Sequence, residues 1–377
     1  MPAGPSEMER FPGNTRVKIL GGLGMVLFLS SRVAFAAEIP SVSSSSPFNG
    51  NGNGSDYPEI IQDIRDQAET QTGKMWIEPA DAVLHQRREI EWARYLKAAM
   101  HLPDWVDLGI ENRTRFESVS HPWRSTAQIG GGRTDSQVVL RSRVRFGLGG
   151  NGHVRFLFEG QDARSYLNNQ PGDFVNTTTV NEWDILQLFG SLTADNVLGS
   201  GLRTDLHFGR MTMDFGSRRY IARNDFRNTT NAFDGIHWQI GKEKLWRFRT
   251  FFVEPVIRDE VQLDKQNNKF LFWGAYLESH QLPWMKFNVY YYGLNDQRFA
   301  NNSFHRTYGT YGFRLFKSPA VNKFHYEAEA AVQVGHVGNV DHFAYNPEFQ
   351  VGYTFDVPWT PRFLLQYTYA SGTRTPG

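Results

Sequence analysis

Cysteine is absent from the 377-residue chain. This absence excludes disulfides, zinc–thiolate sites and a cysteine nucleophile. The mature part of the chain also lacks any uninterrupted apolar run of the roughly 18 residues that a membrane-spanning helix requires. The formal net charge is only +1, so the bulk charge gives no indication of nucleic-acid binding. Stability must therefore come from packing and backbone hydrogen bonds.

Aromatic residues and glycine are abundant instead, with 29 Phe, 15 Tyr, 10 Trp and 35 Gly. Aromatic side chains favour strands, and glycine favours the tight turns between them. The composition is therefore typical of many short strands joined by turns, in an all-β chain.

The N-terminal segment, 1–36, has the pattern of a signal peptide. Basic residues precede an apolar segment, 19–29, that is too short to cross a membrane as a helix, and small residues at 34 and 36 fit a cleavage site. Residues 37–77 are rich in Ser, Asn and Gly and are predicted to be a flexible linker. Residues 78–103 carry apolar side chains at helical spacing and are predicted to form a short periplasmic helix that closes one barrel mouth.

From residue 104 to the end at 377, apolar and polar residues alternate in short runs separated by turn residues. Such alternation predicts antiparallel strands, and the polar inserts 117–136, 164–181 and 214–232 are predicted to be extracellular loops. The thirteen candidate strands lie near 105–117, 137–148, 152–163, 182–192, 202–213, 233–241, 245–254, 269–279, 284–294, 307–317, 323–335, 343–355 and 362–371.

The two faces of these strands differ in chemistry. In the second strand Val138 and Phe146 lie on one face, whereas Arg141, Arg143 and Arg145 lie on the other. An arginine that faces lipid costs about 2–4 kcal/mol near the bilayer midplane, and three would cost on the order of 6–12 kcal/mol. In a membrane barrel the arginines must therefore point inward. A water-soluble β-sandwich, with the reverse arrangement, remains the structural alternative.

Aromatic residues recur near the ends of the candidate strands, as expected of the girdles of a membrane barrel. These residues are Trp105, Trp183, Trp246, Trp284, Tyr308 and Trp359. Together with the exported N-terminus and the lack of cysteine, they favour the membrane barrel over the sandwich.

Motifs for nucleotide binding, zinc proteolysis and serine hydrolysis are absent from the sequence, and the 11 histidines show no metal-ligand spacing. We therefore expect no cofactor and no metal. A hydrolase at the barrel rim would need a serine beside a histidine, for which Ser191 with His207 or His153 is the one candidate.

Several motifs, in their order along the chain, resemble the alginate-export family of outer-membrane proteins. The first strand contains Gly109-x-Glu111-x-Arg113-x-Arg115, and the second contains Arg141-x-Arg143-x-Arg145-Phe146-Gly147. Further matches are Phe158-Glu159-Gly160-Gln161-Asp162, Phe208-Gly209-Arg210, Gly216-Ser217-x-Arg219, Asn224, Asn228, Phe233-Asp234-Gly235 and Tyr369-x-Ser371-Gly372. The resemblance extends from about residue 102 to the end of the sequence.

The resemblance implies a monomeric 18-stranded barrel in the outer membrane, with an arginine-lined pore that passes anionic polysaccharide such as alginate. Implied partners are membrane lipid, the barrel assembly machinery and periplasmic export proteins. Motif and face together predict Arg113, Arg115, Arg143, Arg145 and Glu159 as pore-lining residues. Face alone adds Arg141, Arg155, Arg247, Arg249 and Arg314, and motif alone adds Arg210 and Arg219.

The sequence departs from the family in strand number. Thirteen or fourteen strands are predicted, and the chain ends at Gly377 without a terminal aromatic residue. A barrel must close to remove its edges. We therefore expect a sheet that is incompletely closed, with the C-terminal strands missing.

The sequence thus predicts an outer-membrane channel that exports an anionic polysaccharide by diffusion through an electropositive lumen. Two alternatives remain, namely a porin for small anionic solutes and, from another class, a barrel enzyme at the cell surface.

Overall fold

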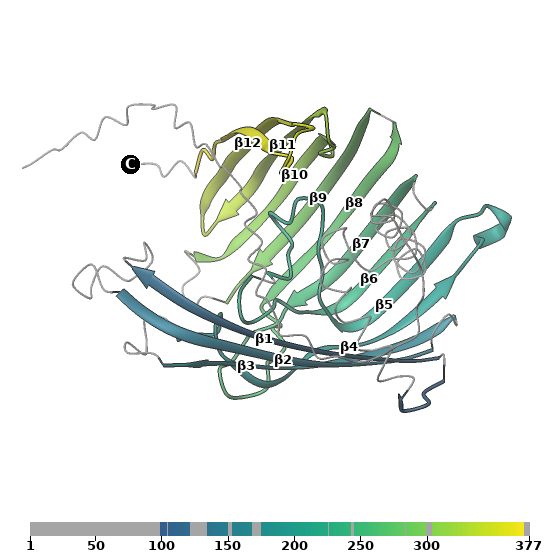
Figure 1. The fold of residues 1–377 in the computed structure, drawn as a ribbon, viewed down its shortest axis with the longest axis vertical. Coiled ribbons are helices and arrows are strands. Elements are labelled where there is room, and N and C mark those ends of the chain that lie inside the picture. Colours follow the sequence, from purple (N-terminus) through teal and green to yellow (C-terminus); the bar gives the residue numbers. More distant parts are fainter. Residues whose placement is uncertain are drawn as a thin grey trace, which may run out of the picture.

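The computed structural model describes residues 99–103, 105–120, 134–149, 153–167, 175–224, 226–242, 245–282, 284–298 and 304–372. They form one 13-stranded antiparallel sheet in which each strand pairs with the next along the chain (Figure 1). The strands are β1 (Val106–Ser120), β2 (Thr134–Leu148), β3 (Val154–Tyr166), β4 (Asn181–Ala194), β5 (Arg203–Met211), β6 (Phe233–Lys242), β7 (Trp246–Pro255), β8 (Phe270–Leu282), β9 (Met285–Asp296), β10 (Arg306–Lys317), β11 (Lys323–Val337), β12 (Val340–Thr354) and β13 (Arg362–Thr368).

All thirteen predicted strands are confirmed, with ends that shift by a few residues. The remaining described element is a single 3-10 turn, Val197–Gly199, between β4 and β5. The predicted signal peptide, the linker and nearly all of the predicted helix 78–103 lie outside the described residues. Within the described part, no helix is long and apolar enough to cross a membrane.

Short and long connections alternate along the sheet. Short turns join β2 to β3, β6 to β7 and β8 to β9, whereas longer segments join β5 to β6 and β7 to β8. The tight turn between β11 and β12 departs from this alternation. Such alternation is typical of outer-membrane barrels, whose periplasmic turns are short and whose extracellular loops are longer.

The sheet curls, so that β1–β3 and β11–β13 lie on opposite sides of a common interior (Figure 1). The strand order leaves β1 and β13 as its two edges, and the described residues of these strands do not pair with each other. The described part of the chain is therefore an open, curved sheet.

The two faces have the orientation that the alternation predicts. The side chains of Arg141 and Arg143 are on the inner face, where these residues are only 3% and 4% exposed. Val144 and Phe146, on the outer face of the same strand, are 48% and 40% exposed. A sheet that buries guanidinium groups and exposes its apolar residues is the reverse of a water-soluble sandwich.

The long segment between β5 and β6 folds back onto the inner face. Met213, Phe215 and Ile221 of this segment are buried, and they pack in one hydrophobic cluster with Phe251 of β7 and Tyr276 of β8. The polar insert predicted at 214–232 thus lies against the inner face of the sheet, and its assignment to the extracellular side stays a prediction. The segment 212–232, hereafter the inner loop, fills part of the interior because its apolar side chains find partners there.

The inner face is not uniformly charged. Along β7–β9 it carries aromatic rings, and Tyr290 stacks on Tyr292 with ring centroids 5.0 Å apart. Phe215 of the inner loop meets Phe251 and Tyr276 at 5.4 Å. The alternation of charged and apolar residues predicts a mainly charged inward face, and this aromatic part differs from that prediction.

Most of the predicted girdle residues lie at strand ends and are exposed. Trp105, Trp183, Trp284 and Trp359 are more than half exposed. Trp246 is intermediate in exposure, and Tyr308 lies on the inner face of β10 with Thr310 and Arg314. Its ring packs against that of His342 at a tilt of 32°, with the ring centroids 4.7 Å apart. The assignment of Tyr308 to a girdle is therefore wrong.

Candidate functional site

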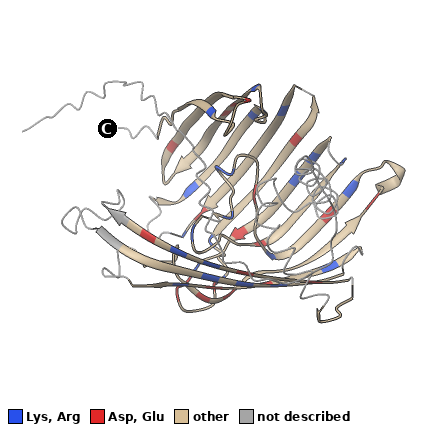
Figure 2. Cartoon of the chain, in the orientation of Figure 1, with Lys and Arg blue, Asp and Glu red and all other residues tan. Residues whose placement is uncertain are grey.

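The charged residues of β1–β3 meet because of strand register. Glu111 of β1 lies opposite Arg143 of β2, and the next strand places Gln161 opposite Arg143. Glu111 pairs with the guanidinium of Arg141 and lies 3.4 Å from that of Arg143. Arg143 donates to the side-chain oxygen of Gln161 at 3.0–3.1 Å and lies 4.0 Å from Glu159. Figure 2 shows these bands of opposite charge along β1–β3. The buried charges are thus compensated within the sheet.

The same arginines hold the inner loop. Arg113 donates to the backbone oxygen of Arg227 at 2.6 Å, and Arg141 donates to the same oxygen at 3.3 Å. Arg115 donates to the backbone oxygen of Phe226, and Arg143 donates to the hydroxyl of Thr230. Arginine suits this role because its fork offers donors to both sheet and loop.

Asn228 anchors the inner loop to three other segments. It is buried, and its amide donates to the backbone oxygens of Leu140 at 2.9 Å, Arg164 at 3.2 Å and Thr179 at 2.8 Å. Period-2 reasoning missed this role, since Asn228 lies outside any strand. The one signal in the sequence was its place in the motif that resembles the family.

The remaining predicted residues of β1–β5 also have acidic partners or polar neighbours. Arg145 lies 3.6 Å from Asp107. Arg155 lies 3.1 Å from Asp205, and Glu159 accepts a hydrogen bond from the amide of Gln187. Each of these charges therefore has at least one polar partner within the sheet.

Arg210 sits where the strand alternation slips. Gly209 has a φ of 123° and lies so close to β4 that an added Cβ would come 2.4 Å from the backbone oxygen of Leu188. Arg210 forms two hydrogen bonds with Asp234, at 2.8 and 3.1 Å, and donates to the backbone oxygen of Asp264 at 3.2 Å. It therefore ties β5 and β6 to the segment between β7 and β8.

Arg219 and Arg314 lie far along the sheet from Arg143. From the inner loop, Arg219 reaches across to Glu329 of β11 at 3.2 Å and also pairs with Glu348 of β12. Arg314 forms a two-point pair with Glu327, with both distances 2.8 Å. The predicted residues therefore occupy several separate clusters.

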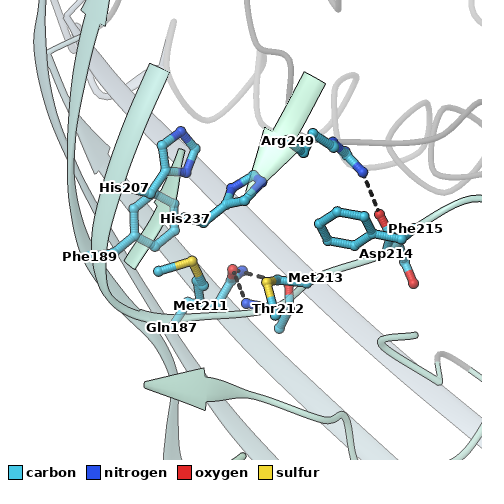
Figure 3. A pocket seen from close by; sticks show the side chains of 10 residues that line it. All are labelled: Gln187, Phe189, His207, Met211, Thr212, Met213, Asp214, Phe215, His237 and Arg249. Atoms are coloured by element: carbon cyan, nitrogen blue, oxygen red, sulfur yellow. Dashed lines mark hydrogen bonds between the residues drawn. The ribbon is translucent and has the colours of Figure 1, made fainter. Parts of the chain in front are cut away.

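Another cluster surrounds Arg249 of β7. Arg247, on the same strand, pairs with Glu278. The guanidinium of Arg249 lies 4.4 Å above the Phe215 ring and donates to the backbone oxygen of Asp214 at 2.9 Å (Figure 3). The residues around Arg249 leave a small cavity of about 20 Å³, lined by Gln187, Phe189, His207, Met211, Thr212, Met213, Asp214, Phe215, His237 and Arg249.

The serine and histidine candidates do not form a hydrolytic pair. Ser191 lies opposite His207 in the β4–β5 register, but among the described residues its hydroxyl has no hydrogen-bond partner. His153 contacts the backbone oxygen of Thr193 at 3.0 Å. Within the described part of the chain, no group of three or more His, Asp or Glu residues could hold a metal ion.

Two buried carboxylates meet where the β7–β8 segment contacts β4. The backbone N–H of Asp264 donates to the Asp184 carboxylate at 3.0 Å. The side-chain amide of Asn181 donates to the Asp264 carboxylate at 3.0 Å. Burial, together with the nearby Asp184 charge, raises the pKa of Asp264 to about 7. This segment is therefore sensitive to pH near neutrality.

Residues 104–377 match the model of the alginate export family, and the chain therefore belongs to that family. The recognition made from the sequence motifs is confirmed. No curated protein matches the chain.

Two solved porin structures are similar to the chain. OccD3 (OpdP) of Pseudomonas aeruginosa is 12% identical with a TM-score of 0.43, and the match covers 71% of this chain and 60% of that one. OmpT of Vibrio cholerae is 9% identical with a TM-score of 0.31, and the match covers 71% and 88% of the two chains. The match to OccD3 thus spans less than two thirds of that protein's length.

Proposed function

We propose that the protein is an anion-selective channel of the outer membrane that exports an anionic polysaccharide such as alginate through an arginine-lined lumen. The observation that carries the proposal is the placement of arginines on the inner face while apolar side chains face outward. Residues with partly exposed guanidinium groups, such as Arg145 and Arg219, are the ones that a passing anion would meet first.

Ion pairing within the sheet sets how such a channel would work. An arginine that already holds a carboxylate binds an added anion weakly, since part of its charge is compensated. Weak and repeated sites are what a conducting pore needs, because cargo must also leave. Pairing and anion transport are therefore compatible in the same lumen.

Planar-bilayer recording tests the proposal. We expect the protein to be anion-selective and its current to be blocked by added polyuronate. Arg145→Gln is expected to reduce both properties, whereas Arg145→Lys retains the charge and is expected to preserve most of the selectivity. Cation selectivity, or a current indifferent to both variants, would contradict the arginine-lined lumen.

A porin for small anionic solutes is the second candidate. The inner loop favours it, because Arg113, Arg115 and Arg143 hold this segment against the wall and narrow the interior. Conductance separates the two functions, since a small-solute porin would be anion-selective without a specific block by polyuronate over an uncharged polymer of equal length.

A further inference from the structure

Beside the inner loop, residues of β6–β11 line an aromatic cavity on the inner face. Its volume is about 230 Å³, and its lining includes Tyr220, Phe270, Phe272, Tyr292, Tyr308 and Gln333. None of the predicted pore-lining arginines takes part in it. We define this site as the aromatic cavity.

The register of the strands places aromatic residues and charged residues in neighbouring rows of the cavity wall. Phe272 of β8 lies opposite Leu294 of β9, which in turn lies opposite Tyr308 of β10. Asp296 follows Leu294 by two residues on β9. It lies opposite Phe270 of β8 on one side and opposite Arg306 of β10 on the other. Residues two apart on a strand share a face. A charged row therefore borders the aromatic row on the same side of the sheet.

The charged row places two arginines beside one aspartate. The carboxylate of Asp296, which is 0% exposed, binds Arg298 at 2.8 Å and also Arg306. The two arginine side chains remain 40% and 35% exposed. Two guanidinium groups share one carboxylate, so this row can still attract an anion at the cavity's edge. Arg298 also covers one face of the Phe270 ring at 4.5 Å.

Polar groups on the far wall complete the aromatic cavity. The hydroxyl of Thr310 accepts a hydrogen bond from the Gln333 amide at 3.2 Å, and the Gln333 oxygen contacts His342 at 3.1 Å. The ring of Tyr308 is held by a tilted contact with the ring of His342. Cavities that combine apolar walls with a few fixed polar groups are the usual form of small-molecule sites.

A hexuronate residue matches these three features together. One side of a pyranose ring presents C–H groups that pack on an aromatic face, its hydroxyls seek side-chain hydrogen bonds, and its carboxylate seeks guanidinium groups. A lipid acyl chain would use the rings but leave the charged row and the amide unused. A small inorganic anion would use the charged row alone.

We propose that the aromatic cavity is a binding subsite for one hexuronate residue of the transported polymer. The sugar ring stacks against Phe272 and Tyr308, the carboxylate meets Arg298 and Arg306, and the hydroxyls meet Thr310 and Gln333. This inference rests on the proposed export function, to which it adds a step that recognises the sugar ring and not only its charge.

Binding of a defined probe tests the subsite. The purified protein in detergent micelles is titrated with a β-1,4-linked mannuronate tetramer by isothermal calorimetry. Tyr308→Leu is expected to weaken binding at least tenfold, whereas Tyr308→Phe keeps the ring and is expected to stay within about threefold. Tyr311→Leu is the matched control, because Tyr311 lies on the same strand but on the outer face and is 55% exposed. Heat-dependent electrophoretic mobility reports the folding of each variant.

The carboxylate contacts have their own test. Arg298→Gln combined with Arg306→Gln is expected to weaken the uronate tetramer at least tenfold and to leave a neutral cello-tetraose, bound weakly by the rings, unchanged. Equal uronate affinity in folded Tyr308→Leu and Tyr311→Leu would overturn the subsite. A second result would also overturn the subsite: the tail of an alkyl glycoside displaces the tetramer, and the arginine substitutions have no effect on tetramer binding. That result would identify an acyl-chain site.

The outcome for transport is distinguishable from the outcome for the subsite. Anion selectivity with a polyuronate block that Tyr308→Leu leaves unchanged would support the channel and reject the subsite. Tyr308-dependent binding of the tetramer in a protein without anion-selective current would support the subsite and reject the channel.

Discussion

Two parts of the inner face solve the same packing problem with different chemistry. On β1–β3, arginines and acidic residues pair across strands and hold the inner loop through its backbone oxygens. On β7–β9, aromatic rings pack against one another and against the loop's apolar residues. The inner loop is thus fixed by hydrogen bonds near residues 226–230 and by apolar burial near residues 213–221.

The first test of this comparison changes one buried side chain in each part. Arg143→Ala removes one of the two guanidinium groups near the buried Glu159, the other being that of Arg223 at 4.0 Å, and also the hydrogen bonds to Gln161. It is expected to lower the free energy of unfolding by about 3–5 kcal/mol. Tyr276→Phe removes only the hydrogen bond between its hydroxyl and the Asn288 amide, so a loss of about 0.5–1.5 kcal/mol is expected. Urea unfolding in detergent, followed by tryptophan fluorescence, measures both. Equal losses would show that the charged part is no more sensitive than the aromatic part.

A second test contrasts the inner and outer faces of β2. Val144→Arg places a charge on the exposed outer face, where it is expected to cost about 2–4 kcal/mol in a bilayer. The matched variant Val144→Leu keeps the position apolar and is expected to change stability little. Folding yield into lipid vesicles, read from heat-dependent mobility, distinguishes them. Normal insertion of Val144→Arg would contradict the assignment of this face to lipid.

A third test loosens the inner loop at its hydrogen-bonded end. Asn228→Ala removes the donor to three backbone oxygens and is expected to cost about 1–3 kcal/mol locally, because buried acceptors lose their partner. Limited proteolysis should then cut within 212–232 sooner, and channel conductance should rise. Asn231→Ala, which removes one bond to the backbone oxygen of Ala222, serves as the weaker control. Unchanged cleavage in both would show that apolar burial alone fixes the loop.

The smallest effect concerns pH and the β7–β8 segment. The pKa of Asp264 rises from 3.8 to about 7 on folding, so the folded state binds the proton more tightly than the unfolded state. The stabilisation is complete below about pH 4, declines between about pH 4 and 7 and is lost above the folded pKa. Protease cleavage of residues 256–269 should therefore be slower at pH 5 than at pH 8. Asp264→Asn should remove most of this pH difference.

Particular residues show how far the sequence alone leads. Alternation in β2 assigned Arg141 and Arg143 to one face and Phe146 to the other, since neighbouring side chains of any strand point to opposite sides. The same rule would have put Tyr308 on the inner face with Arg314, and the error came from giving more weight to its position near a strand end. Gly209 marks the limit of the rule, because its positive φ and its contact with β4 depend on the neighbouring strand.

The thirteen strands, the turns between them and the chemical contrast between the two faces follow from local periodicity and turn residues, so they could be predicted from the sequence. The folding of the inner loop onto the sheet, its anchoring by Asn228 and the contact of Arg219 with Glu329 depend on the three-dimensional arrangement. Those contacts join residues tens to more than a hundred positions apart, and their energy depends on register, curvature and burial, which no local pattern encodes.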